Sequence, residues 1–578
     1  MHVIATAGHV DHGKSTLVRA LTGTDPDRWA EEQRRGMTID LGFAWADIGG
    51  ETVAFVDVPG HERFVPNMLA GVGPVPAALL VVAADGGWMP QTAEHVAALD
   101  ALGVAHAVVA VTRIDLADPA AAVAEVTDRL ASTSLSGARC VPVSAVTGAG
   151  LDDLRHGLRQ LTAALPAPDL DAPLRLWVDR SFTVRGAGTV VTGTLAAGRI
   201  GTGDEVEVAG RRVTVRRLES LGERVESAGA VSRVAVNLRG VEPSDVRRGD
   251  ALLRPGAWPQ TVTVDVRVTG GPDLPARLML HIGSAAVPVR VRPLGATTAR
   301  LALRRPLPLR AGDRALLREP SRHQVASAVT VLDPDPPPLT RRGAGSARGR
   351  DLERLDGPGE LRRRRVARVA ELRRLGVEVP VEPLVGDWLV DPGHAQTLQA
   401  QITAAVAEHA RVRPLEAGPS VESVRRALEL PDAALVAALL APPLQMRSGR
   451  VVDTSRSTLP AELAAALETL AADFREAPFA APDADRLAAL RLGPRELAAA
   501  ERAGAVMRLT EVVVLPPDAV ERATDTLRRL PQPFTAAEAR TALATTRRVA
   551  LPLLELLDRR GVTLRLPDDR RTVRATQG

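Results

Sequence analysis

Residues 8–15 have the sequence Gly8-His9-Val10-Asp11-His12-Gly13-Lys14-Ser15, which fits the phosphate-binding pattern G-x-x-x-x-G-K-[ST]. The apolar stretch before it, residues 2–7, predicts a buried strand, and the stretch after it predicts the first turns of a helix. Backbone N–H groups in such a loop, together with the N-terminus of the helix, surround a phosphate anion. The predicted nucleotide-binding residues of this segment are Gly8, His9, Val10, Asp11, His12, Gly13, Lys14, Ser15 and Thr16.

Lys14 is the single lysine of the chain, against a total of 73 lysines and arginines. A compact ammonium group suits the β- and γ-phosphates, and the planar fork of an arginine is a poor replacement there. We therefore expect Lys14 to be a catalytic residue that contacts these phosphates. The hydroxyl of Ser15 is expected to bind Mg²⁺.

The size and composition of the chain favour a soluble protein of several domains. It has 578 residues, of which 45% are apolar and 25% charged, and the formal net charge is only +4. The single cysteine, Cys140, excludes an internal disulfide bond. The longest obvious apolar run, residues 77–84, is too short to cross a bilayer, and residues 1–15 lack the features of a secretion signal. We expect a cytoplasmic monomer without a membrane partner.

Two further loops carry side chains that suit the hydrolysis of a nucleoside triphosphate. The segment Arg35-Gly36-Met37-Thr38-Ile39-Asp40 precedes a strand, and Thr38 offers a second hydroxyl to Mg²⁺ when a γ-phosphate is present. The predicted strand at residues 52–56 ends in Asp57-Val58-Pro59-Gly60-His61-Glu62, where Asp57 falls at the position of a metal-holding carboxylate. Gly60 has no side chain, so its N–H can approach the γ-phosphate, and His61 follows in place to orient the attacking water. The predicted metal ligands are Ser15, Thr38 and Asp57, and the predicted catalytic residues are His61, Lys14 and Thr38.

The ends of two later strands indicate which base is bound. Residues 108–111 predict a strand that ends in Thr112-Arg113-Ile114-Asp115, and residues 140–143 predict another that ends in Ser144-Ala145. Asp115 can accept hydrogen bonds from the N1 and N2 donors of guanine, which adenine does not present, so this residue selects GTP. The backbone of Ser144 and Ala145 is expected to contact guanine O6, and Thr112 and Arg113 complete the predicted nucleotide site.

These five motifs, in this order, resemble the GTPase domain of translation factors. The Arg-Gly-x-Thr-Ile and Asp-x-Pro-Gly-His-Glu segments resemble the elongation-factor branch in particular. The usual Asn-Lys-x-Asp of that family is Thr-Arg-Ile-Asp at residues 112–115, so an amide is missing at the first position. The resemblance implies GTP, GDP and Mg²⁺ as ligands, and GTP hydrolysis that the ribosome stimulates.

Short valine-rich segments separated by glycine turns fill residues 174–332 and predict two small β-barrels. The stretch 186–204 resembles the second domain of translational GTPases. The segments Asp179-Arg180-Ser181-Phe182-Thr183-Val184 and Ser232-Arg233-Val234-Ala235-Val236-Asn237 resemble selenocysteine-specific elongation factors, in which the matching Asp-Arg pair and second Arg line the aminoacyl pocket. This resemblance implies a pocket formed by Asp179, Arg180 and Arg233, with Asp179 orienting Arg180.

The chemistry of such a pocket suits selenocysteine. A selenol is ionised near neutral pH, so two arginines attract a selenolate, whereas a seryl hydroxyl offers no charge. The alternative is that both arginines make ordinary ion pairs at the ends of strands.

The last 240 residues have a different pattern. The proline-rich segment 333–338 predicts a linker and a domain boundary. Beyond it, helical spacing alternates with β-prone segments at 388–390, 451–452, 512–514 and 572–573, so the pattern repeats about every 60 residues and predicts four winged-helix units. Arginines around a predicted helix and hairpin of the last unit are expected to bind RNA: Arg547, Arg548, Arg559, Arg560, Arg570, Arg571 and Arg574. The alternative is a solvated, basic helix face.

The chain as a whole resembles the bacterial selenocysteine-specific elongation factors. The expected fold is a multidomain protein with an α/β P-loop GTPase domain, two β-barrel domains and a C-terminal array of α+β winged-helix domains. The expected boundaries are 1–170 for the GTPase domain, 171–258 and 259–335 for the barrels, and 336–395, 396–456, 457–516 and 517–578 for the winged helices.

The resemblance implies three partners: selenocysteyl-tRNA, an mRNA hairpin bound by the last unit, and a ribosome stalled at a UGA codon. Two alternatives remain open. One is a translational GTPase for ordinary or initiator aminoacyl-tRNA, and the other is an RNA- or DNA-binding regulator that binds nucleotide without useful turnover.

Overall fold

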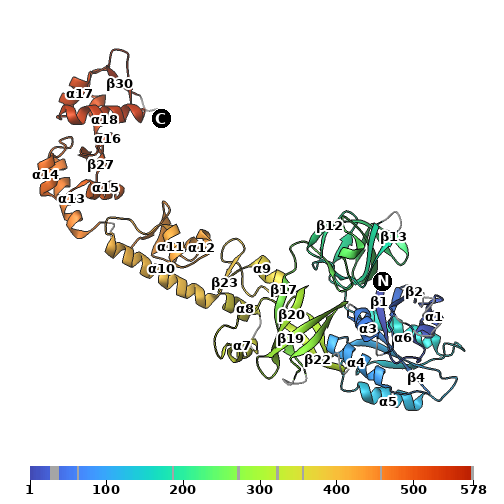
Figure 1. Ribbon diagram of the computed structural model, residues 1–578. Coiled ribbons are helices and arrows are strands. Elements are labelled where there is room, and N and C mark those ends of the chain that lie inside the picture. Colours follow the sequence, from blue (N-terminus) through green and yellow to red (C-terminus); the bar gives the residue numbers. More distant parts are fainter. Residues whose placement is uncertain are drawn as a thin grey trace. The chain divides into compact units, whose positions relative to one another are not determined.

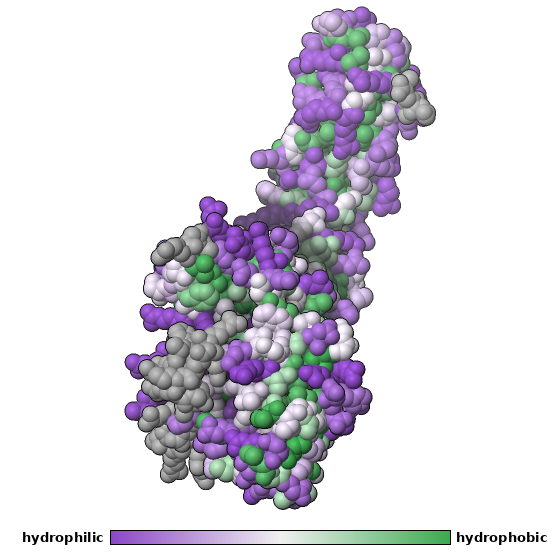
Figure 2. All heavy atoms as spheres, turned by 90° about the vertical axis from the view of Figure 1, so that its right-hand side faces the viewer, coloured by the Kyte–Doolittle hydropathy of each residue, from purple (hydrophilic) through white to green (hydrophobic). Residues whose placement is uncertain are grey.

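The computed structural model describes residues 1–26, 38, 40–61, 64–73, 75–184, 188–269, 274–319, 324–353, 357–455 and 459–574 (Figure 1). The chain divides into two compact units, Met1–Val381 and Glu382–Gly578. Several residues of the motifs above lie outside the described residues, namely 35–37, 39, 62, 186 and 187. Among the helices of the described residues, none combines the length and apolar character that a bilayer crossing needs. Figure 2 shows hydrophilic side chains interspersed with apolar ones on the face that it draws.

The first domain is a sheet with helices on both faces. Its strand order is β2-β3-β1-β4-β5-β6, and all neighbours are parallel except β2 and β3. The strands are β1 (His2–Ala7), β2 (Gly42–Asp47), β3 (Thr52–Asp57), β4 (Ala77–Ala83), β5 (His106–Thr112) and β6 (Arg139–Pro142). Apolar residues of α1 (Lys14–Thr22) and α6 (Leu151–Ala164) form one core, whereas those of α3 (Val65–Val72), α4 (Pro90–Leu102) and α5 (Ala120–Leu130) form the other.

The topology explains where the motifs lie. Strands buried on both faces, such as β4, are nearly continuous apolar runs. Loops that follow the carboxyl ends of parallel strands meet at one edge of the sheet. The phosphate loop after β1, the Asp57 segment after β3 and the Thr112 segment after β5 therefore converge.

The second domain is a barrel in which β11-β16-β7-β9-β15-β12 close through the pairing of β11 with β12. Its elements are β7 (Arg175–Trp177), β8 (Arg180–Val184), β9 (Gly188–Leu195), β10 (Arg199–Gly201), β11 (Glu205–Val208), β12 (Arg211–Ser220), β13 (Glu223–Val225), β14 (Ser227–Gly229), β15 (Ser232–Arg239), η2 (Pro243–Asp245) and β16 (Ala251–Leu253). The third domain is the closed barrel β17-β20-β19-β18-β21-β22. Its strands are β17 (Gln260–Val268), β18 (Arg277–Ile282), β19 (Ala285–Pro293), β20 (Thr298–Pro308), β21 (Arg314–Glu319) and β22 (Gln324–Asp333).

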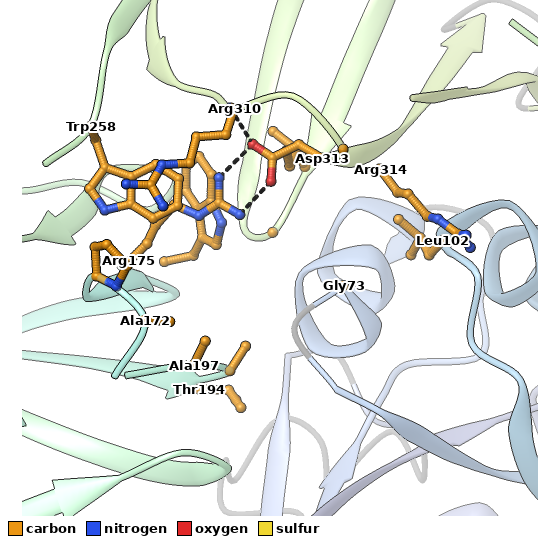
Figure 3. A pocket seen from close by; sticks show the side chains of 16 residues that line it. Gly73, Leu102, Ala172, Arg175, Thr194, Ala197, Trp258, Arg310, Asp313 and Arg314 are labelled. Carbon is orange, nitrogen blue, oxygen red and sulfur yellow. Dashed lines mark hydrogen bonds and ion pairs between the residues drawn. The ribbon is translucent and has the colours of Figure 1, made fainter. Parts of the chain in front are cut away.

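Arginine, aspartate and tryptophan join the two barrels to each other (Figure 3). Arg175 of the second domain donates two hydrogen bonds of 2.7 Å to Asp313 of the third. The guanidinium carbons of Arg175 and Arg310 lie 4.3 and 3.7 Å from the centre of the Trp258 ring. A cavity of about 320 Å³ beside this cluster is also lined by Gly73 and Leu102 of the first domain. The three domains therefore meet at one junction.

Helices and short hairpins form the rest of the chain, and the predicted fold class is confirmed. The first unit continues with α7 (Ala344–Leu352), α8 (Gly357–Arg364), β23 (Val366–Arg368) and α9 (Val369–Leu375). The second unit contains β24 (Trp388–Val390), α10 (Pro392–Val412), α11 (Val421–Ala427), α12 (Ala433–Ala438), β25 (Leu444–Arg447), β26 (Arg450–Asp453), α13 (Ala461–Glu476), α14 (Ala484–Ala489), α15 (Pro494–Arg502), β27 (Met507–Arg508), β28 (Val514–Leu515), α16 (Ala519–Arg528), α17 (Ala536–Ala542), α18 (Arg547–Arg559), β29 (Thr563–Arg565) and β30 (Arg571–Val573). In the described part of this unit, the hairpins β25–β26, β27–β28 and β29–β30 each follow a group of helices.

Buried ion pairs join α7 to the third-domain barrel across the proline-rich segment. Arg348 of α7 is 4% exposed and donates from Nε to Asp265 (2.8 Å) and from Nη2 to Asp333 (2.5 Å). Arg300 donates two further hydrogen bonds to Asp265, of 2.6 and 2.9 Å. Burial is the main cause that raises the pKa of Asp333. Residues 333–338 therefore do not separate the two compact units.

Replacement of Arg348 by methionine is expected to destabilise the first unit by about 3 kcal/mol, because the buried carboxylates of Asp265 and Asp333 each lose a positively charged partner. The free energy of unfolding in urea, followed by circular dichroism, measures the effect. Arg350→Met is the matched control, since Arg350 lies on the same helix and is exposed; its expected effect is within about 0.5 kcal/mol. Equal stabilities of the two variants would contradict this assignment.

Candidate functional site

The phosphate loop connects β1 to α1. Lys14 is 6% exposed, and its ammonium donates hydrogen bonds to the carbonyls of Gly8 (3.1 Å) and His9 (2.8 Å). Gly8 has a φ of +129°, and a Cβ there would lie 2.1 Å from the carbonyl oxygen of Val81. Only glycine fits this position. The lysine side chain thus crosses the loop and fixes its first two carbonyls.

Side chains from β5 and the turn after it hold the other half of the loop. The hydroxyl of Thr112 donates to the carbonyl of His12 at 2.8 Å. Arg113 donates to the carbonyl of Asp11 and forms an ion pair with Asp85 at 3.1 Å. His12 Nδ1 accepts from the N–H of Ala83 at 3.2 Å. Burial, followed by the charges of His9 and Lys14, lowers the pKa of His12 to about 4, so this imidazole is neutral at neutral pH.

Three of the predicted metal-binding oxygens are in contact. Ser15 Oγ donates to Asp57 Oδ2 at 2.7 Å and lies 2.9 Å from Thr38 Oγ1. The other oxygen of Asp57 accepts from Thr6 at 2.7 Å, and Asp57 is fully buried. Two hydroxyls and a carboxylate are hard oxygen ligands of the kind that Mg²⁺ takes. The residues therefore fit a magnesium ion beside the phosphate loop.

The segment after β3 lies against the phosphate loop. A Cβ on Gly60 would lie 2.5 Å from Lys14 Nζ and 2.7 Å from the backbone nitrogen of Val10. His61 follows, half-buried, and its ring centre lies 5.9 Å from that of Phe64. Gly60 therefore lies against the loop that is expected to hold the γ-phosphate, and His61 is the next residue of the chain.

The predicted base-binding residues gather after β5 and β6. Thr112 and Ser144 are buried, Ala145 is half-buried, and the carboxylate of Asp115 is on an exposed turn. The Ser144 N–H donates to the carbonyl of Ala149 at 2.9 Å, which fixes the turn after β6. Thr112 has one hydroxyl proton and donates it to the phosphate loop.

The predicted aminoacyl residues lie between the first two domains. A cavity of about 260 Å³ is lined by Phe43 of β2 and by Arg180 and Arg233 of the barrel. Asp179 accepts from Arg233, with one bond of 2.7 Å, and from the hydroxyl of Thr192. The expectation that Asp179 orients Arg180 is wrong, because Asp179 pairs with Arg233. Arg233 lies on β15, which pairs with β9, the strand that carries Thr192.

Arg180 pairs with a residue that the sequence did not single out for this pocket. Its Nε lies 3.1 Å from a carboxylate oxygen of Asp40, whose other oxygen lies 3.4 Å from Arg248. The ring of Phe43 lies under both pocket arginines, 3.9 Å from the guanidinium carbon of Arg233 and 5.3 Å from that of Arg180. These ion pairs combine three guanidinium groups with two carboxylates, and Glu219 at the rim is exposed. Both arginines that line the pocket are therefore paired with a carboxylate, as the alternative of ordinary ion pairs expects.

The arginines of the last helical unit do not form one surface. Arg571 is 4% exposed and donates to Asp558 at 2.9 Å, so the prediction that it binds RNA is wrong. Arg548 donates to the carbonyls of Pro482 and Val512, and Arg570 donates to Asp568 at 2.6 Å. The predicted RNA-binding arginines that are exposed are Arg547, Arg548, Arg559, Arg560, Arg570 and Arg574. Arg571 cannot be distinguished from them in the sequence, because its pairing depends on the hairpin register.

Four family descriptions match parts of the chain. Residues 1–166 match the elongation factor Tu GTP binding domain, and residues 188–253 match elongation factor Tu domain 2. Residues 273–338 match the β-barrel domain of the selenocysteine-specific elongation factor, and residues 525–572 match the winged helix of elongation factor SelB.

Curated relatives and a solved structure extend this similarity. The selenocysteine-specific elongation factor of Escherichia coli is 37% identical over 463 residues, which cover 76% of this chain and 75% of the relative. That of Desulfomicrobium baculatum is 40% identical over 353 residues, 57% of this chain and 56% of the relative. The crystal structure of a bacterial selenocysteine-specific elongation factor, EF-Sec, covers 100% of both chains at 26% identity with a TM-score of 0.75.

Replacement of Gly60 by alanine is expected to weaken the binding of a nucleoside triphosphate about 10-fold, because the added methyl group takes space beside Lys14 Nζ. Titration of a fluorescent, slowly hydrolysed GTP analogue measures this affinity. Gly137→Ala is the control, since a Cβ at Gly137 meets nothing within 4 Å. An affinity of Gly60→Ala equal to that of the control would show that the contact does not matter.

Proposed function

Since the chain belongs to the family of selenocysteine-specific elongation factors, we propose that it binds selenocysteyl-tRNA and delivers it, with hydrolysis of GTP, to ribosomes at UGA codons that an mRNA hairpin marks. Its first domain is a GTPase domain of the elongation factor Tu kind. One observation carries the proposal: the residues beside the phosphate loop continue directly into the arginine pocket. Thr38 contacts Ser15, and Asp40, two residues later, pairs with Arg180.

GTP is proposed to bind at the phosphate loop. Lys14 contacts the β- and γ-phosphates, and Asp115, with the backbone of Ser144 and Ala145, contacts guanine. Ser15, Thr38 and Asp57 hold Mg²⁺, which neutralises phosphate charge when it is bound. Lys14 can turn from the two carbonyls of its own loop to the phosphates without leaving the site.

Hydrolysis is proposed to proceed by in-line attack of water on the γ-phosphate. His61 is half-buried and directly follows Gly60, and it orients the attacking water toward the nucleotide when the ribosome orders it. The N–H of Gly60 approaches the same phosphate. Thr38 reports the γ-phosphate because its loop leads to Asp40 and then to β2.

The aminoacyl group is proposed to occupy the arginine pocket. Arg180 and Arg233 are each balanced by a carboxylate, and Arg248 adds a further positive charge through Asp40. A selenolate can pair with these guanidinium groups as a carboxylate does, whereas a neutral hydroxyl cannot, so the pocket is proposed to separate selenocysteyl-tRNA from seryl-tRNA. Phe43 supplies an apolar wall that limits the access of water.

The helical tail is proposed to bind the mRNA hairpin through residues 517–578. Six of the arginines predicted for this contact are exposed there, and exposed arginines bind the phosphates of RNA. We propose that the protein acts in the cytoplasm as a monomer.

A carrier of ordinary or initiator aminoacyl-tRNA is the nearer alternative. It would not need the charge of the arginine pocket or a tail that binds mRNA. A regulator that binds nucleotide without turnover is the other alternative, and it predicts no acceleration of GTP hydrolysis by ribosomes. The two experiments that follow separate the proposal from both.

His61→Ala is expected to lower the GTP hydrolysis that programmed ribosomes stimulate by about 100-fold, because the attacking water loses its orienting group. GTP affinity should stay unchanged, since the imidazole does not hold the nucleotide. Single-turnover release of phosphate measures hydrolysis. His156→Ala, an exposed histidine of α6, is the control. If hydrolysis by His61→Ala matches that of the control, the proposed mechanism fails.

Arg180→Met is expected to weaken the GTP-dependent binding of selenocysteyl-tRNA about 10-fold and to leave seryl-tRNA on the same tRNA body within about 2-fold. The two ligands differ in the side chain of the amino acid: a selenolate is negatively charged and pairs with Arg180, whereas the seryl hydroxyl is neutral. Asp40 keeps Arg248 as a partner in the variant, so the loop stays anchored. Equal affinity of the unchanged protein for both tRNAs would favour an ordinary carrier.

A further inference from the structure

The first peptide of the phosphate loop is bound by a residue outside the loop. The N–H of Gly8 donates a hydrogen bond to Nδ1 of His95 at 3.0 Å. His95 lies on α4 and is 1% exposed, so the hydrogen bond is shielded from water. The loop is therefore attached to a helix that is distant in the sequence.

The protonation state of His95 agrees with its role as an acceptor. Burial, followed by the charges of Lys14 and His9, lowers the pKa of His95 to about 3. The imidazole is neutral at neutral pH, and because Nδ1 accepts, Nε2 carries the proton. Within the described residues Nε2 is buried and has no hydrogen-bond partner. Within the described residues, the imidazole of His95 thus makes its hydrogen bond through Nδ1, to the N–H of Gly8.

Both polar groups of Gly8 are bound, in different directions. Its N–H donates to His95, and its carbonyl accepts from Lys14 Nζ at 3.1 Å. Gly8 also lies against the carbonyl of Val81, where only a glycine fits. Without the acceptor on α4, the buried N–H of Gly8 would lose its partner, and a shift of Gly8 would also displace its carbonyl, which belongs to the next peptide, from Lys14.

The helix that carries His95 has a second attachment. Glu94, the preceding residue, pairs with Arg318 of β21 at 3.3 Å, and both side chains are largely buried. A general loosening of α4 can therefore be separated from the loss of the His95 hydrogen bond, because each depends on a different side chain.

We propose that His95 is a positioning residue for the nucleotide: its imidazole acceptor holds Gly8 so that Lys14 and the loop amides retain the phosphates. This inference rests on the proposed binding of guanine nucleotide at the same loop. It goes beyond that proposal by assigning retention of the nucleotide to a side chain that does not contact it. A histidine that only fills the core would affect folding and not nucleotide release.

The test uses the full chain and the dissociation rate of a fluorescent GDP, measured by stopped flow with excess unlabelled GDP. His95→Leu removes the acceptor and is expected to release GDP about 10-fold faster. His95→Asn places an amide oxygen near the position of Nδ1 and is expected to stay within about 3-fold of the unchanged protein. Glu94→Gln, which weakens the attachment to β21, is the control and is expected to leave the rate unchanged. Equal rates for the Leu and Asn variants, or a faster rate for Glu94→Gln, would overturn the inference.

His95→Gln extends the test if the leucine variant does not fold. Glutamine places its amide near the position of Nε2, away from the N–H of Gly8, so we expect fast release, unlike that of His95→Asn. Slow release by both the Gln and the Asn variants would overturn the inference. Failure of the unchanged protein to bind GDP would instead remove the proposed function. Binding by the unchanged protein with equal release from all His95 variants would remove only the role of His95.

Discussion

A phosphate loop must keep its N–H groups directed at an anion, and in this protein side chains fix the direction by binding the carbonyls. Lys14 binds the carbonyls of Gly8 and His9, Arg113 binds that of Asp11, and Thr112 binds that of His12. The orientation of each carbonyl sets the orientation of the N–H on the other side of the same peptide. The converging ends of β1, β4 and β5 make this possible, because they bring side chains from distant parts of the sequence to one loop.

The use of arginine almost everywhere else clarifies what the lysine does. Arg113 is the second residue of the Thr-Arg-Ile-Asp segment, and its fork can join Asp85 and the carbonyl of Asp11 at once. At position 14 the cation must reach two carbonyls of a tight loop and also the phosphates, which a compact ammonium on a flexible stem can do. Gly60 lies close to the same ammonium, so a larger cationic head group would meet backbone there.

The sequence predicted the features that depend on local patterns. The phosphate loop, the strand before it, the two barrels and the repeated helix-and-hairpin pattern follow from motifs and periodicity within short windows. The sequence did not predict that Arg233 is the partner of Asp179, because the pairing of β9 with β15 brings these two residues together. The wrong role predicted for Arg571 and the omission of His95 have the same reason: each residue is buried by elements that a single sequence does not place against it. The buried pairs of Arg348 likewise join residues on β17, β22 and α7.

The segment from Thr38 to Phe43 connects the two halves of the proposed function. Thr38 contacts Ser15 at the phosphate loop, Asp40 pairs with Arg180, and Phe43 lies under Arg233. In the proposed function these contacts couple the two sites, because Thr38 and Asp40 lie two residues apart and one short stretch of chain makes both the contact with Ser15 and the ion pair with Arg180. Because binding free energies are coupled in both directions, a side chain that fills the pocket also stabilises the segment at the phosphate loop.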